Sequence, residues 1–313
     1  MKYNRYVKGS PHVSEIGIGA WQLGSSSYGA AITSEEAVDL VHQALNRGVN
    51  FFDTAPNYGK GTSELRLGKA LKGIDRKKVV INTKFGHTDT GTLNFEADNI
   101  RKSLEGSLKR LQTDYVDSLI IHNPPIEYLN GHDNPHYEVL ERLMKEGKIK
   151  AYGASLDTYK EMKIFMNTTN GKVIEAMFNI LFQDTARAFE LAKEKDVRII
   201  AKIPLDSGWL TGKYGKRSSF KDIRVRWSME DIETRAELVE KVKNIIPDKQ
   251  KITQTAIAFC LAYEAVTTVI PGSKNIAQLL GNLQSINNPV SKTLVKKLEE
   301  FYQKEVKPLN LPW

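Results

Sequence analysis

Four side chains able to donate or accept protons stand at or near the ends of predicted strands: Asp53, Tyr58, Lys84 and His122. Taken singly, each has an ordinary explanation, since an aspartate can cap a helix, a lysine can be a surface cation and a histidine can bond at a rim. A carboxylate, a phenol, an ammonium and an imidazole at corresponding points of successive segments are harder to explain in this way. We therefore take the four as candidate catalytic residues for proton transfer.

A divalent metal is the alternative interpretation of some of these groups. Asp53, His122 and Glu175 offer carboxylate and imidazole groups, which bind such ions. The chain has no H-x-H or H-E-x-x-H pair, however, and its other histidines show no ligand spacing. The sequence therefore favours a site without a metal.

The elements that would position these residues alternate regularly between strands and helices. Residues 15–21 (EIGIGAW) look like a strand, and the following helix has Thr33 and Glu36 at capping-box spacing and Gly48 where it would stop. Further predicted strands, each followed by a helix, are NFFDTA, KVVINTKFG, YVDSLIIHN, IKAYGASL, VIEAMFNILF, RIIAKIPL and VTTVIPGS. This alternation predicts a (β/α)8 TIM barrel, in which catalytic residues lie at the C-terminal strand ends.

Two segments add to the eightfold pattern. Residues 2–9 (KYNRYVKG) are predicted to be a strand of an N-terminal hairpin that closes the bottom of the barrel. Residues 291–304 are predicted to form an extra amphipathic C-terminal helix. The whole chain, residues 1–313, is expected to be one such domain. An open doubly wound sheet is the second possibility, but the G-x-G-x-x-G turn that it would need after an early strand is absent.

Composition narrows the functional classes. The net charge is +8, but Lys and Arg are spread along the chain and interleaved with Asp and Glu, as on solvated helix faces. This distribution argues against a nucleic-acid binder, and no apolar run resembles a membrane span or a secretory signal. We expect a cytoplasmic protein. The single cysteine, Cys260, lies in an apolar run and is expected to be a buried structural thiol.

Four segments, FFDTAPNYG, INTKFG, SLKRLQTDYVDSLIIH and VIPGSKNIAQLLGN, resemble the signature segments of the aldo-keto reductase family. The resemblance covers essentially the whole chain, and such a set in the correct order is far more specific than any one motif. It implies an NADP-dependent oxidoreductase that reduces an aldehyde or ketone to an alcohol by hydride transfer. The catalytic tetrad of the family falls on Asp53, Tyr58, Lys84 and His122.

The chemistry that the resemblance implies can be argued from charge. Hydride transfer to a carbonyl carbon leaves negative charge on the oxygen, so a nearby proton donor lowers the barrier. Tyr58 is implied as this donor, and the ammonium of Lys84 is expected to lower the phenol pKa from its ordinary value of about 10. An ion pair with Asp53 is expected to keep Lys84 charged. His122 is implied as the residue that orients the carbonyl.

The resemblance also implies where the cofactor NADP would bind. The implied contacts are Ser155, Glu175, Asn179, Pro204, Leu205, Asp206, Ser207, Leu210, Lys213, Gly272, Ser273, Lys274, Gln278 and Asn282. The segment from Gly272 onward runs from a strand into a helix N-terminus, which is a natural anion site, and Lys274 beside Ser273 favours the extra phosphate of NADP. The implied walls of the substrate pocket are Trp21, Tyr28, Phe85, Pro124 and Pro125.

Three positions depart from the usual pattern of the family. Leu156 stands where asparagine is common, Glu175 where glutamine is common, and Lys202 where an aromatic ring often stacks on the nicotinamide. Asn179 is an alternative contact and Trp209 an alternative stacking ring, although packing explains Trp209 equally well. The departures keep open a second function, a nucleotide-binding regulatory subunit resembling the channel-associated members of the family. No feature of the sequence indicates an oligomeric state.

Overall fold

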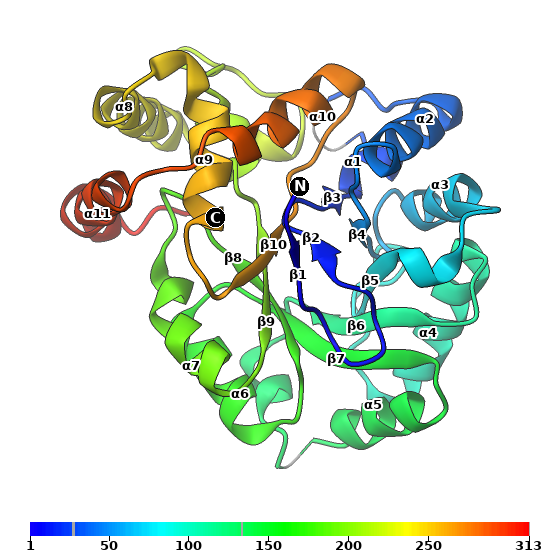
Figure 1. The fold of residues 1–313 in the computed structure, drawn as a ribbon. Coiled ribbons are helices and arrows are strands. Elements are labelled where there is room, and N and C mark those ends of the chain that lie inside the picture. Colours follow the sequence, from blue (N-terminus) through cyan, green and yellow to red (C-terminus); the bar gives the residue numbers. More distant parts are fainter. Residues whose placement is uncertain (27–28, 133, 313) are drawn as a thin grey trace.

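Eight parallel strands form the centre of the protein, as the alternating sequence predicts. The computed structural model describes residues 1–26, 29–132 and 134–312. The strands are Ile18–Gly19 (β3), Phe51–Asp53 (β4), Val80–Phe85 (β5), Val116–His122 (β6), Ile149–Leu156 (β7), Val173–Met177 (β8), Arg198–Lys202 (β9) and Val266–Val269 (β10), hydrogen-bonded in this order. Parallel bridges from Ile16 to Val269 and from Gly19 to Gly272 join the last strand to the first. The sheet is therefore closed into a (β/α)8 barrel (Figure 1).

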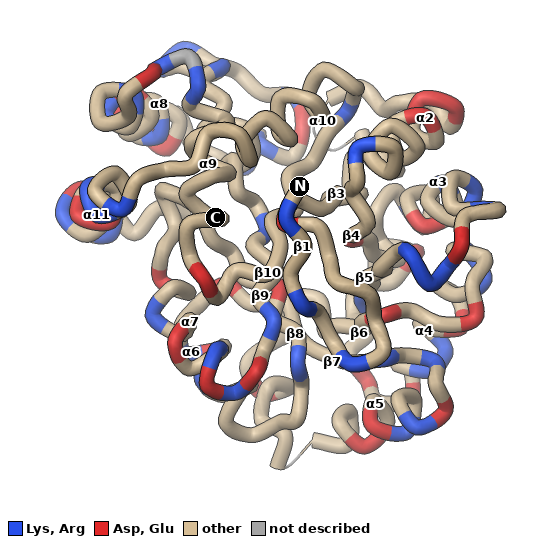
Figure 2. The backbone as a smooth tube through the Cα atoms, in the orientation of Figure 1, with Lys and Arg blue, Asp and Glu red and all other residues tan. Residues whose placement is uncertain are grey.

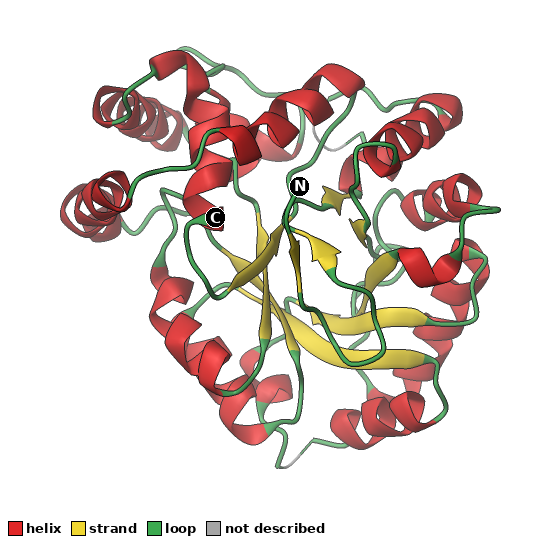
Figure 3. Cartoon of the chain, viewed as in Figure 1, coloured by secondary structure: helices red, strands yellow, loops and turns green. Residues whose placement is uncertain are grey.

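Helices cover the outside of the barrel (Figure 3). They are Trp21–Gly24 (α1), Ser34–Leu45 (α2), Thr62–Leu71 (α3), Ala97–Leu111 (α4), His136–Lys145 (α5), Tyr159–Thr168 (α6), Phe189–Glu194 (α7), Met229–Ile245 (α8), Ile252–Leu261 (α9), Ile276–Leu283 (α10) and Lys292–Phe301 (α11). The predicted capping box is formed at the start of α2, where Thr33 and Glu36 bond each other's backbone amides. Figure 2 shows the interleaving of opposite charges on the outer helices.

The side chains of the strands alternate between two environments, and this alternation positions the site. Phe51, Val80 and Ile120 point into the barrel, where they pack in one buried cluster with Tyr6 of the N-terminal segment. Residues an even number of positions further along the same strands also point inward, so Asp53, Lys84 and His122 form a polar layer above this apolar floor.

The additions to the barrel are also as predicted. The N-terminal hairpin consists of β1 (Tyr3–Asn4) and β2 (Val13–Ser14), which pair antiparallel and lie across one end of the barrel (Figure 1). The extra C-terminal helix is α11, which packs against α8. Cys260 is fully buried in α9, and burial raises the pKa of its thiol. Within the described ranges, no helix is both long and apolar enough to cross a bilayer.

Candidate active site

The four candidate catalytic residues meet at the C-terminal end of the barrel. Asp53, Lys84 and His122 end or nearly end three adjacent strands, and Tyr58 reaches them from the loop after β4. The ammonium of Lys84 lies 5.0 Å from the centre of the Tyr58 ring, and the rings of Tyr58 and His122 lie 5.7 Å apart, edge to face. The structure thus brings together the four residues that the sequence singled out.

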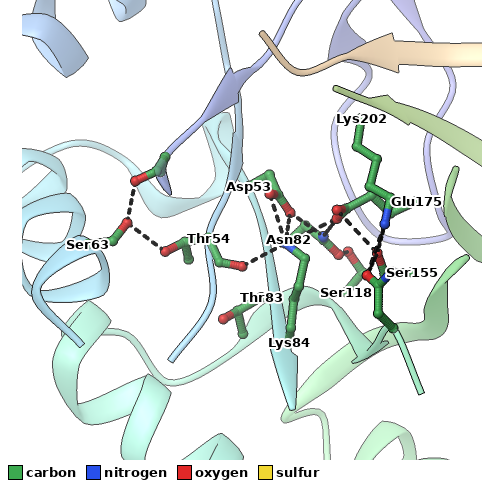
Figure 4. Close-up of polar contacts among 12 residues, drawn as sticks. Asp53, Thr54, Ser63, Asn82, Thr83, Lys84, Ser118, Ser155, Glu175 and Lys202 are labelled. Carbon is green, nitrogen blue, oxygen red and sulfur yellow. Dashed lines mark hydrogen bonds and ion pairs between the residues drawn. The ribbon is translucent and has the colours of Figure 1, made fainter. Parts of the chain in front are cut away.

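Lys84 is held by two carboxylates rather than one (Figure 4). Its Nζ donates to Oδ1 and Oδ2 of Asp53, at 2.7 and 2.8 Å, and to the carbonyl oxygen of Thr54 at 3.0 Å. Oε2 of Glu175, on β8, lies 3.1 Å from the same nitrogen. Asn82 Nδ2 donates to both acids, at 2.7 Å to Asp53 and 3.4 Å to Glu175. Glu175, expected to contact the cofactor, therefore contacts the tetrad.

Burial and charge set the protonation of these groups. Burial opposes the charge of Lys84, but Asp53 and Glu175 outweigh it and raise the pKa of Lys84 above its ordinary value. Burial, and after it the charge of Glu175, raises the pKa of Asp53 to about 8. The expected fall in the pKa of Tyr58 is not found: burial raises it more than the charge of Lys84 lowers it. The phenol therefore keeps its proton across the physiological range.

Burial also sets the protonation of His122, which is neutral. Burial, followed by repulsion from Lys84 and from His87, lowers its pKa well below the ordinary value. Among the described residues its Nδ1 has no hydrogen-bond partner although it is buried. His87 stacks on it with ring centres 4.4 Å apart, a contact that the sequence did not suggest because His87 lies in an irregular loop after β5.

Lys202 closes the other side of the polar layer. At the end of β9, its ammonium donates to Ser155 Oγ and to Asn123 Oδ1, both at 2.9 Å, and lies 2.8 Å from Oδ1 of Asp157. The Ser155 hydroxyl is also 3.4 Å from Oε1 of Glu175. The position where the family often has an aromatic ring is thus part of a charged network that runs from Glu175 towards the rim (Figure 4).

Several predicted cofactor contacts are turned inward by the fold. Asn179 lies beyond the end of β8 in a turn, where it accepts from the amides of Leu181 and Phe182 and donates to the carbonyl of Ile203. Its side chain therefore holds the turn. Trp209 is fully buried against Tyr214, Phe220 and Trp227, so packing, not stacking on a nicotinamide, explains this tryptophan.

The loop after β9 has a buried ion pair of its own. Asp206 and Leu210, in the short 3₁₀ segment Asp206–Thr211, have no exposed surface. The Asp206 carboxylate lies 3.6 Å from Nε of Arg235 on α8, and burial raises its pKa to about 6. Asp206 and Leu210 therefore anchor the loop and do not face a ligand. Pro204 is buried as well, whereas Leu205 and Ser207 are partly exposed and Lys213 is exposed.

The segment from Gly272 to Asn282 has the predicted form of a strand end followed by a helix N-terminus. Asn282 Nδ2 donates to Ser273 Oγ at 3.0 Å and to the carbonyl of Gly272 at 3.3 Å, so both polar side chains are used within the segment. Gln278 accepts from the Lys274 amide at 2.8 Å. Lys274 Nζ donates to the carbonyl of Ala30 at 3.0 Å.

A basic group surrounds Lys274. Its ammonium is close enough to Arg224, Lys213 and Asp222 for their charges to affect its pKa, which burial lowers. Arg224, held by Asp222 and Tyr214 in the segment Ile223–Arg226, is a candidate that the sequence did not single out. Three cations and one carboxylate leave this end of the site positive.

The residues predicted to line the substrate pocket lie in different environments. Trp21 stacks on Tyr58 with ring centres 5.2 Å apart and planes within 8°, so it borders the tetrad. Phe85 follows the inward Lys84 by one position, points away from the barrel interior and is fully buried in the outer core, which corrects its assignment to the pocket. Pro124 is buried and Pro125 is exposed. Tyr28 lies outside the described residues.

Two further observations concern a possible metal site and a cavity elsewhere on the protein. Among the described residues, no group of three His, Cys, Asp or Glu side chains could hold a metal ion, and the Lys84 ammonium lies where an ion between Asp53 and Glu175 would be. A cavity of about 740 Å³ is lined from α5 and α6 by residues such as Glu141 and Asn167, and it borders none of the tetrad.

Comparison with known proteins identifies the family. The sequence model of the Aldo/keto reductase family matches residues 15–303. L-galactose dehydrogenase of Arabidopsis thaliana is 29% identical over 96% of this chain and 93% of its own, and the NADH-specific methylglyoxal reductase of Escherichia coli (strain K12) is 26% identical over 93% and 96%. The holo form of aldo-keto reductase AKR11C1 from Bacillus halodurans superimposes with a TM-score of 0.78 at 26% identity, covering 96% of each chain. The chain belongs to the aldo-keto reductase family, whose members are oxidoreductases that reduce carbonyl compounds.

Proposed function

We propose that this protein is an NADP-dependent reductase of aldehydes or ketones, with Tyr58 as the proton donor. The observation that carries the proposal is the complete tetrad in one buried cluster, with Lys84 between Tyr58 and Asp53. Hydride transfer to a carbonyl requires a proton at the oxygen, and Tyr58 holds one beside the ammonium of Lys84. The neutral imidazole of His122 lies edge to face with Tyr58, and its proposed role is to hold the carbonyl oxygen.

The residues present fit a nicotinamide cofactor, which supplies the hydride when bound. A carboxamide needs one acceptor and one donor, and Glu175 and Ser155 offer both at the polar layer. Nδ1 of His122, which has no hydrogen-bond partner among the described residues, is a buried polar atom that a bound molecule can satisfy. At the other end, the helix N-terminus of α10 with Lys274 and Arg224 offers positive charge to phosphates.

We expect the purified protein to oxidise NADPH when a reactive aldehyde is added, because the acid machinery is complete. Absorbance of the reduced cofactor, followed over a panel of aldehydes with NADPH and NADH in parallel, measures this directly. Cofactor binding without turnover over the whole panel would instead favour the regulatory-subunit function, for which the unusual charges at Glu175 and Lys202 are the specific observation.

Lys274→Ala is expected to weaken NADPH by very roughly 10- to 150-fold more than NADH, because only NADPH carries the extra ribose phosphate. A charge-assisted contact with that phosphate is typically worth about 1.5–3 kcal/mol, more than the bond to the Ala30 carbonyl that it replaces. Quenching of tryptophan fluorescence gives both Kd values, since Trp21 stacks on Tyr58.

Lys216→Ala is the matched control, because Lys216 lies in the loop after β9 that also carries Lys213 and Arg224, but it pairs with Glu237. It should change neither Kd appreciably. Equal weakening of NADPH and NADH in Lys274→Ala would remove the basis for NADP preference, and the E. coli relative named as NADH-specific shows that this outcome is open within the family.

A further inference from the structure

Two buried carboxylates contact one ammonium in the polar layer. Asp53, Lys84 and Glu175 are each at most 2% exposed, and Lys84 Nζ lies 2.7 Å from one acid and 3.1 Å from the other. If all three groups were ionised, the cluster would carry one net negative charge away from water. An uncompensated buried charge is unfavourable, so the cluster is stabilised by holding one proton or by meeting another cation.

Among the residues that the structure describes, the groups next to the cluster do not supply that compensating charge. Lys202 is bound to Asp157, Ser155 and Asn123. Burial, followed by repulsion from nearby positive charges, lowers the pKa of His122 and of His87, so both rings are neutral.

The other groups that face the cluster, within the described part of the chain, keep their protons or are paired elsewhere. Burial raises the pKa of Tyr58 and of Tyr6, which faces the cluster from the barrel floor. Asp117, further from the site, pairs with Arg76 and Lys150. Burial, and after it the charge of Glu175, raises the pKa of Asp53 to about 8, so Asp53 is the acid of the cluster that can exchange a proton near neutrality.

In the proposed function, a bound nicotinamide cofactor would add the compensating positive charge only when it is oxidised. The oxidised nicotinamide ring carries one positive charge and the reduced ring carries none. We propose that Asp53 and Glu175 together hold one proton while the cofactor is reduced, and that this proton passes through Lys84 and Tyr58 to the carbonyl oxygen. The inference rests on the proposed function and gives Glu175 a role outside the tetrad.

The step balances in atoms and charge. The carbonyl carbon receives a hydride with its two electrons from the cofactor, the C=O π bond opens, and the oxygen takes the proton of Tyr58. Tyr58 regains a proton from Lys84, whose Nζ lies 5.0 Å from the centre of the Tyr58 ring, and Lys84 regains one from the carboxyl pair that it contacts. Two carboxylates and a cationic ring then replace one carboxylate, one carboxylic acid and a neutral ring, so the total charge of ring and site is unchanged.

Proton release on cofactor binding tests this without turnover. Calorimetric titration at pH 7 in buffers of different ionisation enthalpy counts the protons released when NADP⁺ or NADPH binds. We expect about 0.5–1 more proton released with NADP⁺, and a Kd for NADP⁺ that falls by up to about tenfold per pH unit towards pH 8 while that for NADPH does not. Both cofactors carry the same phosphates, so protons exchanged at the basic group around Lys274 cancel in the difference.

Glu175→Gln, which keeps the shape and removes the charge, should abolish the extra proton, because Asp53 and Lys84 then form a neutral pair. Glu64→Gln is the matched control: it makes the same change at a buried carboxylate on α3 that pairs with Arg110 and does not contact Lys84, and it should keep the extra proton. Equal proton release on binding of NADP⁺ and NADPH to the wild-type protein would overturn this inference but not the proposed function. An unchanged difference in Glu175→Gln would do the same, whereas a chain that binds neither cofactor would overturn the proposed function as well.

Discussion

Tyr58→Phe is expected to lower turnover of an aldehyde by about 10²- to 10⁴-fold, the usual worth of a positioned general acid, with cofactor affinity little changed. The substitution removes only the hydroxyl, and the ring that stacks on Trp21 and lies edge to face with His122 remains. Steady-state rates with NADPH, together with Kd values from fluorescence, separate the loss of proton donation from a loss of binding.

Tyr6→Phe is the control for this prediction. Tyr6 is likewise a buried tyrosine inside the barrel, and its hydroxyl is 2.6 Å from Ser118 Oγ, but it lies in the floor formed by the N-terminal segment. It should retain most of the activity. A Tyr58→Phe protein as active as the wild type would exclude Tyr58 as the donor and require another acid at the carbonyl.

Lys84→Met is expected to lower the free energy of unfolding by about 3–5 kcal/mol at pH 8, besides abolishing turnover. The substitution keeps the length of the side chain but leaves Asp53 and Glu175 buried without their shared cation, and breaking a buried ion pair from one side typically costs this much. Urea denaturation followed by fluorescence or circular dichroism gives the change.

The pH dependence and a rescue identify the cause. The folded state of Lys84→Met binds protons on its buried acids more tightly than the unfolded state does, so the deficit should shrink as the pH falls from 8 towards 5. Adding Asp53→Asn and Glu175→Gln to Lys84→Met should recover most of the stability, because amides replace the uncompensated charges. A deficit that is the same at both pH values and is not rescued would mean that lost packing, not charge, is responsible.

Much of the architecture could be predicted because its determinants are local. The capping box of Thr33 and Glu36, the apolar stripes of the helices and the recurrent strand–helix units each act within a few residues, and together they leave a closed parallel barrel as the fold. The tetrad could be found for a related reason, since a barrel gathers the C-terminal ends of all its strands at one face. Alternation along β5 also carried unused information: once Lys84 points inward, Phe85 must point outward.

The partners of each polar side chain were decided only by the tertiary structure. Glu175 contacts Lys84 through the barrel interior, which β8 and β5 both line. The spacing of the two residues in the sequence does not reveal that they are close. Asp206 pairs with Arg235, and Asn179 holds a turn. These two residues match cofactor contacts of the family by position, but their side chains stabilise the fold. The sequence by itself determined which strands exist and which acid–base groups end them. The register and closure of the barrel decided which of those groups contact one another, because electrostatic contact between buried groups depends on their distance in space.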